Sequence, residues 1–137
     1  MDISADLLEL SRTPVVVVSA GVKSILDIKR TLETLETHGV PTVTFGAKEF
    51  PAFFSPTSGI PTPFQIDTAA DVARAYWTSQ QLGMSNGMLV AVPNISPAGE
   101  SVELAIQESL DEANKLKICG AGVTPFVLKR VAEKTGT

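Results

Sequence analysis

Runs of apolar residues alternate with helical patterns along this chain, and the alternation predicts an α/β fold. A β-branched run at residues 14–19 is typical of a parallel strand buried on both faces, and strand patterns return at residues 39–45 and 87–92. Apolar residues at helical spacing predict helices over residues 4–10, 25–38, 68–83, 100–116 and 124–134. The chain therefore begins with a helix followed by a strand–helix–strand unit.

Capping residues mark where three of these helices begin. Ser4 is a suitable N-cap for the first helix, and Thr68 and Asp71 resemble a capping box. Thr124 followed by Pro125 is typical of an N-cap and a first helical position.

A long loop rich in Pro, Gly, Ser and Thr is expected at residues 47–63. Phe50, Phe53 and Phe54 are interleaved in it. These rings either cover a planar ligand or anchor the loop to the core, and the sequence favours the anchoring role.

Composition and charge limit the class of protein. With 137 residues, 44% of them hydrophobic and 19% charged, the chain is expected to form one domain with its own core. The net charge is −4 and no basic cluster is present, so nucleic acid is not expected as a partner. No apolar stretch approaches the roughly 18 residues that span a bilayer, and Asp2 and Asp6 stand where a secretory signal needs basic residues. We therefore expect a soluble cytoplasmic protein without membrane contact.

Cysteine and histidine each occur once, as Cys119 and His38. A single thiol excludes an internal disulfide and a cysteine-based metal cluster. A lone histidine in the last turn of a helix offers no basis for a histidine-dependent triad.

Lys23 lies between the strand at residues 14–19 and the helix that follows it. Open α/β sheets bind ligands just beyond the carboxyl ends of their strands. The positive end of a helix dipole and partial desolvation both favour a neutral, nucleophilic amine, which can attack a sugar aldehyde carbon and form an imine. Lys23 is therefore the candidate catalytic residue, although a lysine after a strand can also simply extend into solvent.

Two acids flank Ser4 at the start of the first predicted helix, namely Asp2 and Asp6. Two carboxylates and a hydroxyl are oxygen ligands of the kind that Mg²⁺ or Mn²⁺ binds. The same residues also suit a helix cap with solvated acids, and their spacing alone favours the cap. In a compact sheet, Asp6 and Lys23 could approach the same edge.

Several segments match a known family in their order and spacing. They are Asp2-Ile-Ser-Ala-Asp-Leu7, Ser19-Ala-Gly-Val-Lys-Ser-Ile-Leu-Asp27, Thr31-Leu-Glu-Thr-Leu-Glu-Thr-His-Gly-Val40, Glu49-Phe-Pro-Ala-Phe-Phe54 and Thr124-Pro-Phe126. Together they resemble the pseudouridine-5′-phosphate glycosidase family, which includes the indigoidine synthase A-like proteins. The resemblance extends over nearly the whole chain.

The resemblance implies a three-layer α/β/α sandwich with a mainly parallel central sheet, here a partial fold, that assembles as a homotrimer. The implied reaction converts pseudouridine 5′-phosphate and water to uracil and ribose 5-phosphate by breaking a carbon–carbon glycosidic bond. The family's covalent nucleophile, which forms a Schiff base with the ribose C1′, corresponds to Lys23. Its Mn²⁺ ligand corresponds to Asp2, and its substrate-contacting segment corresponds to Ser4, Ala5 and Asp6.

The match corresponds to the middle and later part of a family member, as a single domain over residues 1–137. The family's acidic proton donor and its second substrate-binding lysine precede the matched part. Val92 stands where the family has a polar residue, and the stretch from Cys119 to Val123 departs from a more polar segment. The alternative to a glycosidase is therefore a noncatalytic fragment that serves in oligomerisation or in phosphosugar binding.

Overall fold

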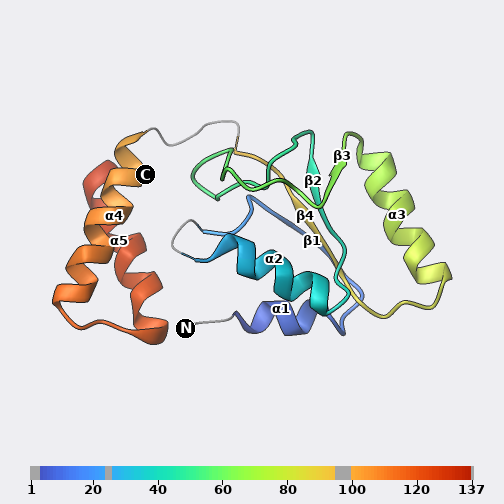
Figure 1. Ribbon diagram of the computed structural model, residues 1–137, viewed down its shortest axis with the longest axis horizontal. Coiled ribbons are helices and arrows are strands. Elements are labelled where there is room, and N and C mark those ends of the chain that lie inside the picture. Colours follow the sequence, from blue (N-terminus) through green and yellow to red (C-terminus); the bar gives the residue numbers. More distant parts are fainter. Residues whose placement is uncertain (1–3, 24–25, 95–99, 137) are drawn as a thin grey trace. The chain divides into compact units, whose positions relative to one another are not determined.

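The computed structural model describes residues 4–23, 26–94 and 100–136 and contains a parallel sheet with helices (Figure 1). In chain order the elements are α1 (Ala5–Leu10), β1 (Val16–Ser19), α2 (Ile28–Thr37), β2 (Thr42–Phe45), β3 (Phe64–Ile66), α3 (Ala69–Gln81), β4 (Met88–Ala91), α4 (Glu100–Lys115), the short 3-10 helix η1 (Gly120–Gly122) and α5 (Val123–Thr135). All the predicted helices and strands are present, with shifted ends, and β3 is added to them.

The elements divide between two compact units. One unit holds the sheet with α1, α2 and α3, and the other holds α4, η1 and α5. Each unit has buried apolar residues of its own. The expectation of a single domain over residues 1–137 stays a prediction.

β4 is a central strand of the sheet, whose order is β1-β4-β2-β3 with every pair parallel. Leu89 of β4 lies opposite Val17 of β1, and Val90 lies opposite Val43 of β2. Every residue of β4 is buried, as expected for a strand with neighbours on both sides and helices on both faces. Because all the pairs are parallel, the strands end at the same edge of the sheet.

Alternate residues of β4 face two different helical layers. Leu89 and Ala91 belong to a core cluster with Leu10 of α1 and the apolar face of α2. Met88 and Val90 belong to a second cluster, against which α3 packs. The sheet therefore lies between α1 and α2 on one face and α3 on the other, which confirms the expected α/β/α sandwich (Figure 1).

The prediction that the first strand is buried on both faces is wrong. Val16 is 36% exposed and Val18 is 65% exposed. Within the described part of the chain β1 pairs with β4 alone, so it forms an edge of the sheet. A run of β-branched residues predicts a strand, but it does not distinguish an edge strand from a central one.

The sequence pattern does not predict β3. This strand has 3 residues, and two of them, Phe64 and Gln65, are exposed. It also follows Pro63, so neither its length nor its polarity distinguishes it from the loop before it. Its parallel pairing with β2 identifies it as a strand.

Two helices begin at residues other than those predicted. The side chain of Asp27 accepts a hydrogen bond from the Arg30 N–H at 3.0 Å, so Asp27 is the N-cap and α2 begins at Ile28. α5 follows η1 directly, with Gly122 rather than Thr124 at its N-cap position. Pro125 lies in the first turn of α5, where a missing N–H costs no helical hydrogen bond.

The second unit is a pair of helices that pack against each other, α4 and α5. Two ion pairs join them: Arg130 contacts Glu112 at 2.6 Å, and Lys134 contacts Glu108 at 2.7 Å. Such partly exposed pairs add little stability, so the apolar contact matters more. Its buried residues are Val102, Ala105, Ile106 and Ala113 of α4 with Val127 and Val131 of α5.

No helix within the described ranges combines the length and the apolar composition needed to cross a lipid bilayer.

Candidate active site

Three chain segments leave the sheet at its carboxyl edge next to one another. Residues 20–23 follow β1, residues 92–94 follow β4, and residues 46–63 follow β2. The N–H of Val92 donates to the carbonyl oxygen of Ser19 at 2.7 Å, which extends the pairing of β1 with β4 beyond the two strands. This edge is where ligands bind in open parallel sheets.

Lys23 lies in the segment that follows β1, and its side chain is partly buried. Its carbonyl oxygen accepts a hydrogen bond from the Leu26 N–H at 2.9 Å. The predicted position at the carboxyl edge is therefore observed, but the expected position at a helix start is not, because α2 begins only at Ile28. The dipole argument for Lys23 loses its support, since that effect is confined to the first turn of a helix.

The backbone before Lys23 is in close contact with the loop that follows β2. The N–H of Phe53 donates to the carbonyl oxygen of Ala20 at 3.0 Å, and Gly21 forms an isolated antiparallel bridge with Ala52. A Cβ atom added to Gly21 would lie 2.0 Å from the carbonyl oxygen of Pro51, and the φ of Gly21 is +93°. The approach therefore requires glycine for both space and backbone conformation.

The loop after β2 is anchored in the core. Phe50 and Pro51 are fully buried, and the Phe50 N–H donates to the Ile60 carbonyl oxygen at 2.9 Å. The hydroxyls of Thr44 and Thr62 hydrogen-bond to each other at 2.7 Å and join β2 to the end of the loop. The anchoring role expected for the loop aromatics is thus confirmed for Phe50.

The other two aromatics of this loop, Phe53 and Phe54, are only partly buried. Their rings meet edge to face, with centroids 4.9 Å apart and an interplanar angle of 81°. They lie in the stretch that contacts Ala20 and Gly21, so their backbone belongs to the same edge of the sheet as Lys23.

The predicted substrate-binding residues Ser4, Ala5 and Asp6 form the start of α1. Ser4 caps the helix by accepting the Asp6 N–H at 3.3 Å, and all three residues are exposed. Leu10, at the other end of α1, accepts the N–H of Gly87 just before β4. The start of α1 therefore points toward the carboxyl edge, the same edge as Lys23 (Figure 1). Contact between these residues and a substrate stays a prediction.

The predicted metal ligand, Asp2, lies outside the described residues. Within the described ranges, no group of three or more His, Cys, Asp or Glu side chains could hold a metal ion. The described residues alone thus offer no ligand set for Mn²⁺.

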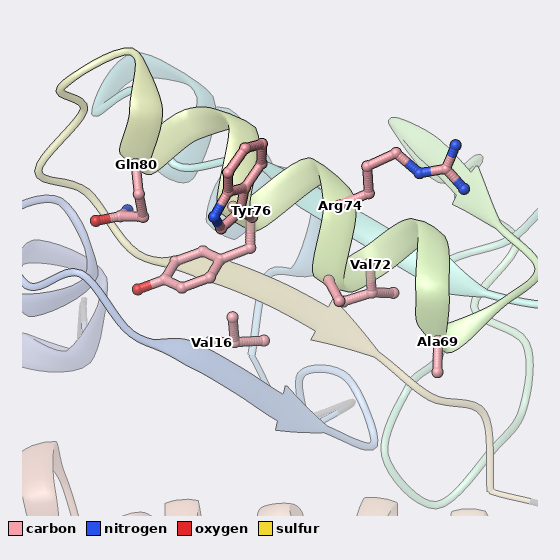
Figure 2. Close-up of a pocket in the computed structure, with 8 residues that line it drawn as sticks. Val16, Ala69, Val72, Arg74, Tyr76 and Gln80 are labelled. Atoms are coloured by element: carbon pink, nitrogen blue, oxygen red, sulfur yellow. The ribbon is translucent and has the colours of Figure 1, made fainter.

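An apolar groove lies between α3 and Val16 of β1, on the face of the sheet opposite α1 and α2 (Figure 2). Figure 2 shows the side chains of α3 over Val16, with Tyr76 and Gln80 at one end and Ala69 at the other. The Tyr76 hydroxyl donates to the Pro14 carbonyl oxygen and ties α3 to the start of β1. None of the predicted site residues lines this groove.

Comparison with known protein families gives a match along the whole chain. The family described as indigoidine synthase A like protein matches residues 1–137. The chain belongs to this family. The membership confirms the resemblance carried by the segments around Asp6, Lys23 and Phe50.

Relatives and solved structures agree with this membership. Pseudouridine-5′-phosphate glycosidases of Deinococcus radiodurans and Legionella pneumophila are 50% and 48% identical over 99% and 98% of this chain. An enzyme with the same name from Arabidopsis thaliana is 46% identical over 99% of the chain. The chain spans only 44%, 44% and 42% of the lengths of these curated relatives.

Two solved structures are similar in fold and in sequence. The prealnumycin C-glycosynthase, in complex with ribulose 5-phosphate, has a TM-score of 0.86 and is 35% identical over 98% of this chain. An indigoidine synthase A-like protein from Thermotoga maritima has a TM-score of 0.78 and is 37% identical over 99% of it. The chain covers 45% and 46% of these two proteins.

Sequence reasoning missed the partner of the segment that carries Lys23, which is the stretch from Pro51 to Phe53. A signal was present, because both segments are among those that resemble the family. Their contact was not foreseen because it is made mainly by backbone atoms. Val92, where the resemblance leads us to expect a polar residue, packs against the cluster that faces α3.

The contact at Gly21 predicts a local effect of adding a methyl group. Gly21→Ala should lower the free energy of unfolding more than Gly59→Ala, because both glycines have positive φ but only Gly21 lacks space for a Cβ atom. The control Gly59→Ala should cost about 1–2 kcal/mol through its φ of +73° alone. Urea unfolding of both variants measures the difference, and equal losses would contradict the close approach to Pro51.

Proposed function

We propose that this chain forms the lysine-bearing part of a pseudouridine-5′-phosphate glycosidase, which releases uracil and ribose 5-phosphate. The observation that carries the proposal is the partly buried Lys23 at the carboxyl edge of a parallel sheet, in a segment whose Ala20 and Gly21 contact the loop after β2. The names of the curated relatives from Deinococcus radiodurans and Legionella pneumophila support it.

The proposed reaction passes through an imine on Lys23. The amine adds to the ribose C1′ while the bond from C1′ to the ring oxygen breaks; the nitrogen then gives up a proton, and the ring oxygen takes one up. The nitrogen lone pair then forms the C=N bond while the bond from C1′ to the uracil carbon breaks, and that carbon takes up a proton. Water hydrolyses the imine, which releases ribose 5-phosphate and restores the amine. This route divides one difficult carbon–carbon cleavage into easier steps.

The remaining roles in the proposal follow from the family resemblance. Ser4, Ala5 and Asp6 contact the substrate, and Asp2 binds Mn²⁺ or another divalent cation. Assembly as a homotrimer and a cytoplasmic location are proposed on the same ground.

A noncatalytic role in phosphosugar binding or oligomerisation is the alternative. The observation that favours phosphosugar binding is that the similar prealnumycin C-glycosynthase has been solved in complex with ribulose 5-phosphate. The two functions differ in whether Lys23 forms a covalent bond, and that difference can be measured.

Borohydride trapping tests the covalent role of Lys23. Incubation of the chain with ribose 5-phosphate and borohydride should add one reduced sugar phosphate at Lys23, because borohydride reduces an imine to a stable amine. Peptide mass analysis locates the adduct. Lys23→Arg should lose it, because arginine keeps the positive charge and does not form an imine.

Lys29→Ala is the matched control, because Lys29 is an exposed lysine on α2 close to Lys23 in sequence. This variant should be labelled like the wild type. An unlabelled Lys23 in the wild type, or equal labelling of exposed lysines, would contradict the proposed function and favour the noncatalytic alternative.

Calorimetry with Mn²⁺ tests the role of Asp2. Asp2→Asn should weaken Mn²⁺ binding by roughly tenfold or more, because it removes a charged oxygen ligand from a hard cation. Glu36→Gln, which removes a charge from an exposed position on α2, should bind Mn²⁺ like the wild type. Equal Mn²⁺ affinity of the wild type and Asp2→Asn would contradict the proposed role of Asp2 as a metal ligand.

A further inference from the structure

The backbone that carries Lys23 lies outside regular secondary structure. Its described residues, 20–23 and 26, lie between the end of β1 at Ser19 and the N-cap of α2 at Asp27. Two of its described hydrogen bonds are local, from the Gly21 N–H to the Ser19 hydroxyl at 3.3 Å and from the Leu26 N–H to the Lys23 carbonyl oxygen at 2.9 Å. Other contacts must therefore determine where this segment lies relative to the rest of the edge.

One contact that reaches beyond the segment is the packing of Val22 against the core cluster. The other is made with the backbone of the loop after β2. The Phe53 N–H donates to the Ala20 carbonyl oxygen, and Ala52 bridges Gly21. Ala52 is 4% exposed and Pro51 is fully buried, so this part of the loop is fixed to the core. It thus provides a rigid support for the two residues that precede Val22 and Lys23.

Phe53 forms the centre of an unusual turn. Its φ is +67°, in the left-handed region that bulky residues rarely adopt. The Phe54 N–H donates to the Ala52 carbonyl oxygen at 2.8 Å, which closes a γ-turn around Phe53, and the Ala52 N–H donates to the Ser55 carbonyl oxygen at 2.9 Å. A positive φ at an aromatic residue is strained and persists only where the surrounding structure enforces it.

We propose that Phe53 is a positioning residue for Lys23. Its turn holds the Phe53 N–H on the Ala20 carbonyl oxygen and Ala52 against Gly21, and so fixes the backbone that presents the lysine amine to the sugar carbon. Phe53 acts through its backbone conformation, and its ring is not required for this role. The inference rests on the proposed function, since it assigns a support to the lysine of that site.

A series of substitutions separates the backbone of Phe53 from its ring. Phe53→Asn and Phe53→Gly remove the ring but accept a positive φ, whereas Phe53→Val strongly disfavours it. Phe54→Val is the matched control, because it breaks the same ring pair at a residue that is not among those with positive φ. Each variant of the 137-residue chain is tested by the rate at which the borohydride-trapped adduct forms at Lys23 as a function of ribose 5-phosphate concentration.

The maximal trapping rate should fall roughly tenfold in Phe53→Val, with a much smaller change in the half-saturating concentration. Phe53→Asn, Phe53→Gly and Phe54→Val should stay within about twofold of the wild type. A folded Phe53→Val chain with the wild-type rate would overturn the proposal. So would losses in Phe53→Asn and Phe53→Gly as large as in Phe53→Val, because the ring would then be the cause.

Circular dichroism identifies a variant that does not fold. If Phe53→Val is unfolded, Phe53→Ala takes its place. Its trapping rate should be lower than the rates of Phe53→Asn and of the wild-type-like controls, but should not fall to zero. A wild-type rate in Phe53→Ala would then count against the proposal.

A separate measurement distinguishes this inference from the proposed function. If the wild-type chain forms no adduct at Lys23, the proposed function is wrong. A pulse of acetic anhydride then tests, without a substrate, whether the Phe53 turn fixes the position of Lys23. The acetylation rate of Lys23 relative to exposed Lys29 should change in Phe53→Val and stay constant in Phe53→Asn. An unchanged ratio in Phe53→Val would overturn the positioning role.

Discussion

The parallel pairing of β4 with β1 on one side and β2 on the other is the constraint on which the site depends. β4 is buried along its whole length, and its alternate residues hold both helical layers. Because its neighbours run in the same direction, three chain segments leave the sheet at one edge. The hydrogen bond from Val92 to Ser19 continues the alignment past the strand ends. Lys23 therefore emerges beside the ends of β4 and β2.

Close backbone packing then fixes the segment before Lys23 against the loop after β2. Gly21 lies against Pro51 at a distance that excludes any side chain, and Phe53 reaches Ala20 with its N–H. These contacts are short and are made by backbone atoms, which have no alternative rotamers. On the loop side, Pro51 and Ala52 are buried. The Lys23 side chain therefore begins at a backbone position that these contacts help to fix.

Much of the fold and part of the site could be predicted from the sequence. Apolar spacing and capping residues identified the helices, and a strand followed by Lys23 identified the carboxyl edge. The exposure of Val18 and the existence of β3 depend on which strands are neighbours, and local sequence does not specify that. The turn at Phe53 contradicts its residue preference, so a prediction from propensities must miss it.

Amide hydrogen exchange at Phe53 tests the central claim most directly, which is that the β2 loop is bonded to the segment carrying Lys23. We predict slow exchange of the Phe53 amide, comparable to that of the Val92 amide. The Phe53 N–H donates to the Ala20 carbonyl oxygen, just after β1, and the Val92 N–H donates to the Ser19 carbonyl oxygen at the end of β1. Exchange of the Phe53 amide at the rate of an unstructured peptide, with Val92 still protected, would contradict the account.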